Sequence, residues 1–183
     1  SPGSAFTAPK PETYFEESGV AGDLLENLRR VRELHDAAAE FAAVAKHNEK
    51  DSKWASKSAI AFALRLNAER AVMGLAPLRL DQRLSEAAAG HSKEMADLHY
   101  FAHESPVAEN KTPGDRARNA RFEGSWSGEN IFMGSTSPDS AYGGWWGSDG
   151  HRFIMFAKGP NTLGIGPVGT YWTMMTGSKA WKK

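Results

Sequence analysis

The sequence predicts an α+β fold in which helices pack around a small antiparallel sheet. Through residue 100, apolar side chains recur every three or four positions, which is the period of amphipathic helices. After Gly128 the pattern changes to the alternation of half-buried strands. Because the helices come first and the strands last, the order favours antiparallel strands over βαβ units.

The first expected helix covers residues 24–47 and follows an extended arm, residues 1–22, rich in Pro, Gly, Ser and Glu. Asp23 is a suitable N-cap. Leaving several large apolar side chains in water forfeits roughly 1.5–3 kcal/mol each. We therefore expect the helix to bury one stripe against the main domain or a second copy of the chain: Leu24, Leu28, Val31, Phe41 and Ala45.

Two further helices are expected over residues 53–73 and 82–99, with Gly74 as the stop of the former and Asp81 as the N-cap of the latter. The segment from residue 101 to 127 shows no clean period and is expected to be a long loop with a helical turn. The expected strands are Asn130–Met133, Leu163–Pro167 and Tyr171–Thr176. Glycines within the second of these strands indicate the close approach of another backbone or a helix.

Composition excludes several classes of function. Lysine and arginine total 22, as do aspartate and glutamate. This balance argues against nucleic acid or an anionic membrane surface as the partner. No apolar run approaches the roughly 20 residues of a transmembrane helix. There are no cysteines, which excludes disulfides, thiolate metal sites and cysteine nucleophiles. The first residues lack the features of a signal peptide, so any such segment is expected to have been removed.

The histidines and one glutamate are the candidates for chemistry. His35 and His47 are expected in surface or packing roles, and His91 as a core residue bonded to Ser92 or a backbone carbonyl. His99 and His103 are spaced i and i+4, but lack the glutamate of a zinc protease motif.

His151, in GSDGHR, is expected in a glycine-bounded turn. Glu129 lies between a glycine and an asparagine directly before an apolar run. A buried carboxylate there needs a partner or a chemical role.

Taken together, several motifs resemble the bacterial, SCP-like branch of the CAP superfamily, the relatives of cysteine-rich secretory proteins, antigen 5 and plant pathogenesis-related proteins. The resemblance covers roughly residues 58–177 and implies an α-β-α sandwich with a cleft lined by two histidines and two acids. It rests, in chain order, on NAERAVMGLAPLRLDQRLSEAAAGHS, HYFAH, GENIFMG, WWGSDGHR, LGIGPVG and YWT.

By this resemblance, His103 matches the first histidine of the cleft, Glu129 the first acid and His151 the second histidine. The second acid of the family is replaced by Ser148, three residues after Trp145. The adjacent Asp149 is a poor substitute because its helix angle differs. The resemblance therefore implies a cleft in which His103 and His151 hold Zn²⁺ or another divalent metal, without the complete tetrad.

Two classes of function follow from this implied cleft. The first is a secreted binding module for a small molecule, lipid, glycan or protein partner. The second is a metal-dependent hydrolase, a protease or esterase, with Glu129 as its catalytic general base. Two histidines leave zinc short of the three protein ligands usual in catalytic sites, so binding is favoured over catalysis.

A metal-free hydrolase using Ser148 or Ser127 is disfavoured, because neither serine lies in a nucleophile-elbow pattern. The expected organisation is a flexible arm (1–22), an N-terminal helical extension (23–56), through which the chain can form a dimer, and a CAP-like domain (57–183). The resemblance implies an extracellular or periplasmic location, and the lack of cysteine fits a bacterial origin.

Overall fold

A computed structural model describes the backbone of residues 22–181 and the side chains of residues 26–181. The chain divides into two compact units, residues 1–40 and 41–183. The domain organisation expected from the sequence, with its boundary at residue 56, stays a prediction. The expected arm, residues 1–22, lies outside the described residues except for Gly22, as does the side chain of Leu24.

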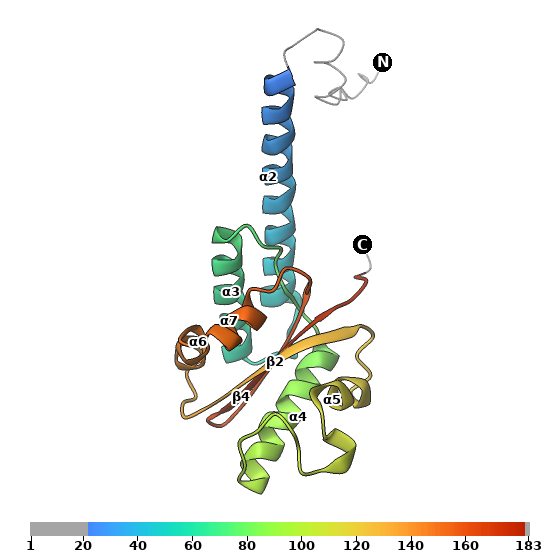
Figure 1. The fold of residues 1–183 in the computed structure, drawn as a ribbon, viewed down its shortest axis with the longest axis vertical. Helices are drawn as coiled ribbons and strands as arrows, with labels where there is room; N and C mark the ends of the chain where they lie inside the picture. Colours follow the sequence, from blue (N-terminus) through green and yellow to red (C-terminus); the bar gives the residue numbers. More distant parts are fainter. Residues whose placement is uncertain (1–21, 182–183) are drawn as a thin grey trace. The chain divides into compact units, whose positions relative to one another are not determined.

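The order of elements follows the expected sequence of helices and then strands (Figure 1). Helices 53–73 and 82–99 were placed to within a few residues. Beyond them, a short helix forms over residues 149–155, where a turn was expected, and another over residues 113–119, near the helical turn expected within the long loop. The described elements are α2 (Gly22–Lys46), η1 (His47–Asp51), α3 (Lys57–Val72), β1 (Arg79–Leu80), α4 (Gln82–Leu98), η2 (Ala108–Asn110), α5 (Pro113–Asn119), β2 (Ser125–Met133), α6 (Pro138–Trp146), α7 (Asp149–Met155), β3 (Thr162–Val168) and β4 (Tyr171–Ser178).

The sheet has four strands in the order β1-β3-β4-β2. β4 pairs antiparallel with both β2 and β3, as the alternation predicted. β1 pairs parallel with β3, which makes the sheet mixed rather than wholly antiparallel. The sequence missed β1 because two residues are too short to show a period. Two buried asparagines, Asn48 and Asn67, stabilise this segment by hydrogen bonds to the backbone of Leu78 and Leu80.

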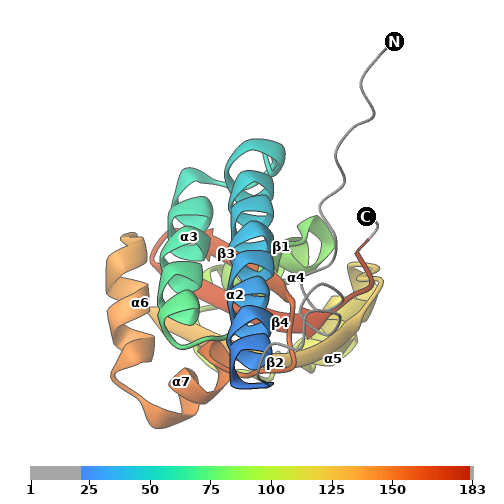
Figure 2. The same cartoon turned by 90° about the horizontal axis from the view of Figure 1, so that it is seen from above.

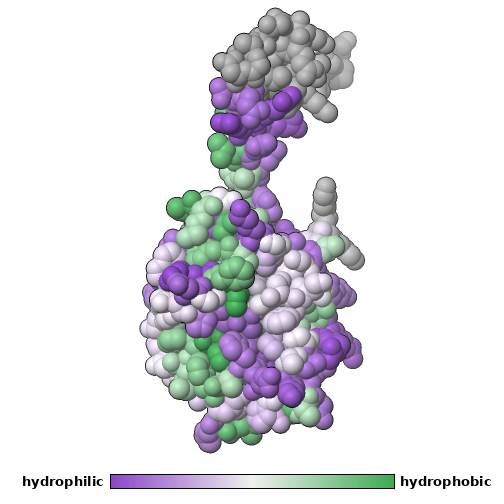
Figure 3. All heavy atoms as spheres, viewed as in Figure 1, coloured by the Kyte–Doolittle hydropathy of each residue, from purple (hydrophilic) through white to green (hydrophobic). Residues whose placement is uncertain are grey.

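Helices cover both faces of the sheet, as expected for an α-β-α sandwich (Figures 1 and 2). On one face, α3, α6 and α7 enclose the larger core, in which Trp145 and Trp172 are fully buried. On the other face, α4 and α5 pack on a smaller core that contains Leu84 and Met175. On the side of the molecule shown in Figure 3, hydrophobic residues form small groups among hydrophilic ones.

Glycines in β3 allow α4 to lie directly on the strand. A Cβ added at Gly164 would lie 2.4 Å from the carbonyl oxygen of Leu84, and one at Gly166 would lie 2.1 Å from the amide nitrogen of Ala89. Real Cβ atoms do not approach other atoms this closely. The expected close approach of a helix at these glycines is confirmed.

The residues of the expected α2 stripe differ in exposure. Val31 is 62% exposed and the nearby Leu34 is 71% exposed, whereas Phe41 and Ala45 are half-buried. Helical periodicity shows that a helix has an apolar face, but it does not show what covers that face. Association of the stripe with a second copy of the chain stays a prediction.

Candidate functional site

Glu129 lies in β2, at one edge of the sheet, and its side chain is directed toward the face that carries α4 and α5. The residue is only 5% exposed. Arg116 of α5 donates a hydrogen bond from Nη2 to Oε2 over 2.7 Å. The other oxygen, Oε1, lies 2.9 Å from Nδ1 of His103. Each carboxylate oxygen therefore has its own partner, which answers the question that a buried carboxylate raises.

Arg116 holds the site together and was missed by the sequence analysis. Its guanidinium also donates to the backbone carbonyls of His103 (3.0 Å) and Asn110 (2.9 Å), so it joins the loop before α5 to β2. Thr112 and Asp115 form a capping box that starts α5 and places Arg116 in its first turns. That capping box was visible in the sequence, but the partner of the arginine was not.

His103 presents one ring nitrogen to Glu129 and leaves the other available. A carboxylate paired with an arginine accepts hydrogen bonds, so Nδ1 of His103 carries the proton and donates it. In a neutral imidazole with its proton on Nδ1, Nε2 has the free lone pair. The side chain is 51% exposed, so Nε2 is the nitrogen available to a ligand, a metal ion or a proton.

The loop that carries His103 is held by a second carboxylate, Glu94 of α4. Ser105, Tyr100 and Asn110 all donate hydrogen bonds to it. Burial raises the pKa of Glu94, but these three hydrogen bonds outweigh burial and leave the pKa below its ordinary value. Burial and then the bond to Glu94 raise the pKa of Tyr100 to about 12. The loop between α4 and α5 is therefore fixed by polar contacts rather than by an apolar core.

His91 of α4 lies behind the site, fully buried, with Nε2 4.0 Å from Oε1 of Glu129. Its Nε2 lies 3.0 Å from the carbonyl oxygen of Ala102, one of the two partners expected, and its Nδ1 lies 3.3 Å from the hydroxyl of Tyr100. The other expected partner, Ser92, instead donates to the carbonyl of Gly166. Burial lowers the pKa of His91, and the charge of Arg116 lowers it further against the opposing effect of Glu129. His91 is therefore a core residue that takes up a proton less readily than an exposed histidine.

His151 approaches from the opposite face of the sheet. It lies within α7, not in a glycine-bounded turn as expected, because Ser148 starts a helix that includes the predicted turn. Asn130 of β2 donates to its backbone carbonyl over 3.1 Å. Its Nδ1 is buried and has no hydrogen-bond partner. Burial lowers the pKa of His151, and the positive charge that His103 carries when protonated lowers it further.

The position of the missing second acid is occupied by the N-cap of α7, Ser148. The adjacent Asp149 is exposed and pairs with Arg152 instead. Among the residues that the structure describes, no hydrogen bond joins Ser148 or Ser127 to a histidine side chain. This arrangement gives no support to a serine nucleophile.

The side chains available as ligands limit how a metal ion can bind at this site. Among the side chains of residues 26–181, no group of three or more His, Cys, Asp and Glu is arranged to hold a metal ion. Glu129 has both oxygens engaged, which leaves His103 and His151 as the available nitrogen ligands. A three-ligand catalytic zinc site does not fit these residues. A histidine that donates its other N–H to a carboxylate is the usual arrangement of a metal-bound imidazole, and His103 has it.

The fold and the site define a class of protein: an α-β-α sandwich with two histidines and a buried glutamate at the β2 edge of the sheet. Residues 64–171 match the family model described as CAP, the cysteine-rich secretory protein family. The chain belongs to this family. The match covers more than half of the sequence and includes His103, Glu129 and His151.

Relatives agree with this assignment. The Bacillus subtilis protein YkwD is 36% identical over 109 residues, 58% of this chain and 42% of the relative. A crystal structure of an extracellular protein of Bacillus anthracis that contains an SCP domain has a TM-score of 0.62 and 32% identity, over 65% of this chain and 39% of the other.

An outer surface protein of Borrelia burgdorferi is similar in fold alone, with a TM-score of 0.57 and 14% identity over 68% of this chain and 95% of the other. The chain spans less than half the length of the curated relatives that it matches. No helix among the described residues is long and apolar enough to cross a membrane.

Proposed function

We propose that this CAP domain is an extracellular binding module whose ligand contacts His103 and His151 at the β2 edge. One observation carries the proposal: both oxygens of Glu129 are engaged, one by Arg116 and one by His103. A general base must accept a proton from the reacting group, so a carboxylate with both oxygens committed is poorly placed for that role. The geometry favours Glu129 as the partner that orients His103.

A divalent metal such as Zn²⁺ is part of the proposal. His103 through Nε2 and His151 would be its protein ligands, with Glu129 behind His103 as the carboxylate that fixes the ring. A bound ion would supply positive charge for an anionic group of the ligand. Two protein ligands imply modest affinity, and the remaining positions would be filled by water or ligand.

The extracellular location is also a proposal. It is supported by the Bacillus anthracis relative, which is described as extracellular and shares the SCP domain at 32% identity. The ligand class stays open among small molecules, lipids, glycans and proteins. The hydrolase alternative requires Glu129 to accept a proton from the reacting group while Arg116 and His103 bind its two oxygens.

Calorimetric titration with Zn²⁺ at neutral pH tests the proposal. We expect measurable binding to the parent and its loss in a His103→Ala, His151→Ala double variant. His35→Ala is the matched control, because His35 is exposed and distant in sequence from the site, and it should bind like the parent. Equal affinity in the parent and the double variant would remove the metal from the proposal.

A second readout separates binding from hydrolysis. The parent and a Glu129→Gln variant would be incubated, with and without Zn²⁺, with peptide, ester and glycan substrates. We expect no turnover by either protein. Turnover by the parent that disappears in Glu129→Gln, with Zn²⁺ binding retained, would favour the hydrolase instead.

A further inference from the structure

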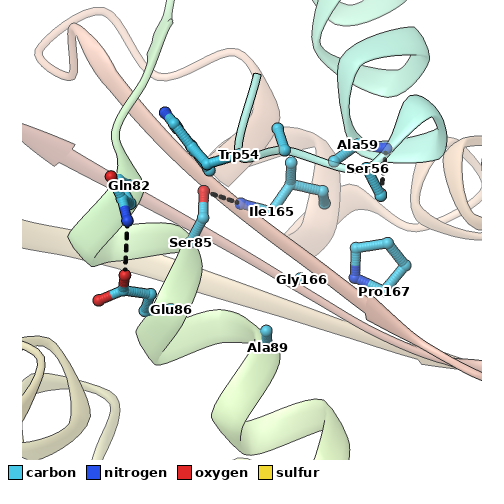
Figure 4. A pocket seen from close by; sticks show the side chains of 11 residues that line it. Trp54, Ser56, Ala59, Gln82, Ser85, Glu86, Ala89, Ile165, Gly166 and Pro167 are labelled. Carbon is cyan, nitrogen blue, oxygen red and sulfur yellow. Dashed lines mark hydrogen bonds between the residues drawn. The ribbon is translucent and has the colours of Figure 1, made fainter. Parts of the chain in front are cut away.

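A second pocket lies at the edge of the sheet opposite to Glu129. β1 pairs only with Thr162 and Leu163 of β3, so the outer edge of β3 beyond Leu163 has no strand beside it. A pocket of about 240 Å³ occupies this position, between the loop before α3, the outer side of α4 and β3 (Figure 4). All of its lining residues belong to the unit formed by residues 41–183.

The interior of this pocket, here called the β3-edge pocket, is apolar and made by small residues. Ala55, Ala59 and Ala89 leave the space, and Ile165 and Pro167 form its β3 side. Trp54 lies on one side of the pocket and is 38% exposed (Figure 4). An exposed indole beside a small cavity offers a flat apolar surface on which a ring can stack.

The backbone at this edge lacks the free N–H groups that an added strand would need. The amide of Ile165 already donates to Oγ of Ser85, over 3.2 Å, as Figure 4 shows. Pro167 has no N–H to offer. An extended peptide would need backbone donors at these alternate positions. The pocket therefore suits a ligand held by side chains.

The rim is polar but electrically balanced. Ser56, Gln82 and Glu86 surround the pocket. The carboxylate of Glu86 accepts hydrogen bonds from Gln82 (2.9 Å) and from Arg83 (3.0 Å), so its charge is paired on α4. An ion has no unpaired opposite charge to bind here, and a neutral ligand with hydroxyl groups finds both donors and acceptors.

We propose that the β3-edge pocket binds one ring of a neutral sugar. A pyranose has an apolar face that can stack on Trp54 and hydroxyl groups that can reach Gln82, Glu86 and Ser56. A purely apolar ring could not form hydrogen bonds with the polar side chains of the rim. This site is separate from the His103–His151 site, since the two lie at opposite edges of the sheet, and it does not depend on the function proposed for that site.

Two-dimensional NMR of the ¹⁵N-labelled full chain, titrated with cellobiose and with N,N′-diacetylchitobiose, tests the proposal. For a site that holds one ring, we expect at least one of these sugars to bind with a dissociation constant on the order of millimolar. Addition of that sugar should change the chemical shifts of the Trp54 indole N–H and of the backbone amides of Ala59 and Ala89. Trp54→Ala should weaken binding several-fold, up to about ten-fold, the loss expected of one stacking contact.

Two further variants and a second ligand show whether binding occurs in the β3-edge pocket and requires a sugar. Trp126→Ala is the matched control, because Trp126 has nearly the same exposure (39%) and lines a different pocket, and its binding should equal that of the parent. Ala89→Leu removes no contact but fills the pocket, and should weaken binding with the fold retained by circular dichroism. Cyclohexanol, an apolar ring with one hydroxyl, should bind more weakly than the sugar.

Three outcomes would overturn the proposal. One is the absence of shifts up to about 100 mM of either sugar, far above the expected dissociation constant. Another is equal loss of binding in Trp54→Ala and Trp126→Ala, which would mean that the Trp54 pocket is not the site. The last is tighter binding of cyclohexanol than of both sugars, which would make this a site for apolar molecules.

Discussion

The sites at the two edges of the sheet depend on different physical interactions. At the β2 edge, Glu129 is held by Arg116 and His103, so the position of a few charges determines the geometry. At the β3 edge, glycines and alanines leave room for α4 and for a pocket, so the geometry depends on volume. Removing one charge should therefore destabilise the β2 edge, and adding one carbon atom should destabilise the β3 edge.

Removing the Arg116 charge should have the largest effect on the fold. Arg116→Met leaves Glu129 buried without its ion-pair partner and frees the carbonyls of His103 and Asn110. Breaking a buried pair in this way costs about 3–5 kcal/mol of the free energy of unfolding. Urea denaturation measures this loss.

The matched control for Arg116 lies two residues along the same helix. Arg118 pairs with Asp115 on the surface, where ion pairs contribute little. Arg118→Met should change the free energy of unfolding by less than about 0.5 kcal/mol. Similar losses in the two variants would contradict the view that the buried pair fixes the β2 edge.

Adding a methyl group at the β3 edge should have the next largest effect. Gly166→Ala places a Cβ 2.1 Å from the amide nitrogen of Ala89, so α4 must move away from the strand. Overpacking of this kind costs typically about 1–3 kcal/mol. Thermal and urea denaturation measure it.

Gly90 on α4 is the control for that substitution, because an added Cβ meets nothing within 4 Å. Gly90→Ala should stabilise the helix by roughly 0.5–1 kcal/mol. If Gly166→Ala were as stable as the parent, the close contact between α4 and β3 would not be a determinant of this edge.

Stability at the β2 edge should depend on pH through His91. Its pKa is lowered in the folded state, so the unfolded chain binds the proton more readily. Its contribution to stability is complete above the ordinary pKa of about 6.5 and is lost as the pH falls below that value. Urea denaturation between about pH 7.5 and 5 should show this slope.

His91→Leu is the comparison for the pH series. The variant removes the titrating group, so the slope of stability against pH below about 6.5 should become shallower, whatever its stability at neutral pH. An unchanged slope would assign the pH dependence to other groups and count against a lowered pKa of the buried His91.

The smallest effect is expected in the first compact unit. Val31 is 62% exposed, and surface substitutions usually change stability by less than about 0.5 kcal/mol. Val31→Ser should therefore leave the denaturation midpoint of dilute protein unchanged. A larger loss that grows with protein concentration would instead show that a second copy of the chain covers the stripe.

The sequence predicted most of the fold because its signals are local. Asp81 caps α4 as expected, with its side chain accepting from the amide of Leu84, and the period-2 runs became β3 and β4. β1 was missed because its two residues carry no period. The partner of the α2 stripe stayed open because amphipathicity does not identify the partner of a helix.

The candidate site was predicted only in part, for a related reason. His103 and Glu129 came from motifs and lie 2.9 Å apart. Arg116 was not predicted from a motif. Glu129 and His103, which it contacts, each lie 13 residues away along the chain, and no spacing rule links residues at that separation. The helical position of His151 was missed because glycines in GSDGHR favoured a turn over a short helix.

The tautomer of His103 shows whether Glu129 orients this histidine. In ¹⁵N-labelled protein at about pH 8, where an ordinary histidine is neutral, long-range ¹H–¹⁵N correlation spectra identify the protonated ring nitrogen. We expect Nδ1 to carry the proton and Nε2 to be free. A proton on Nε2 would show that the ring does not donate to Glu129 and that this carboxylate does not orient it.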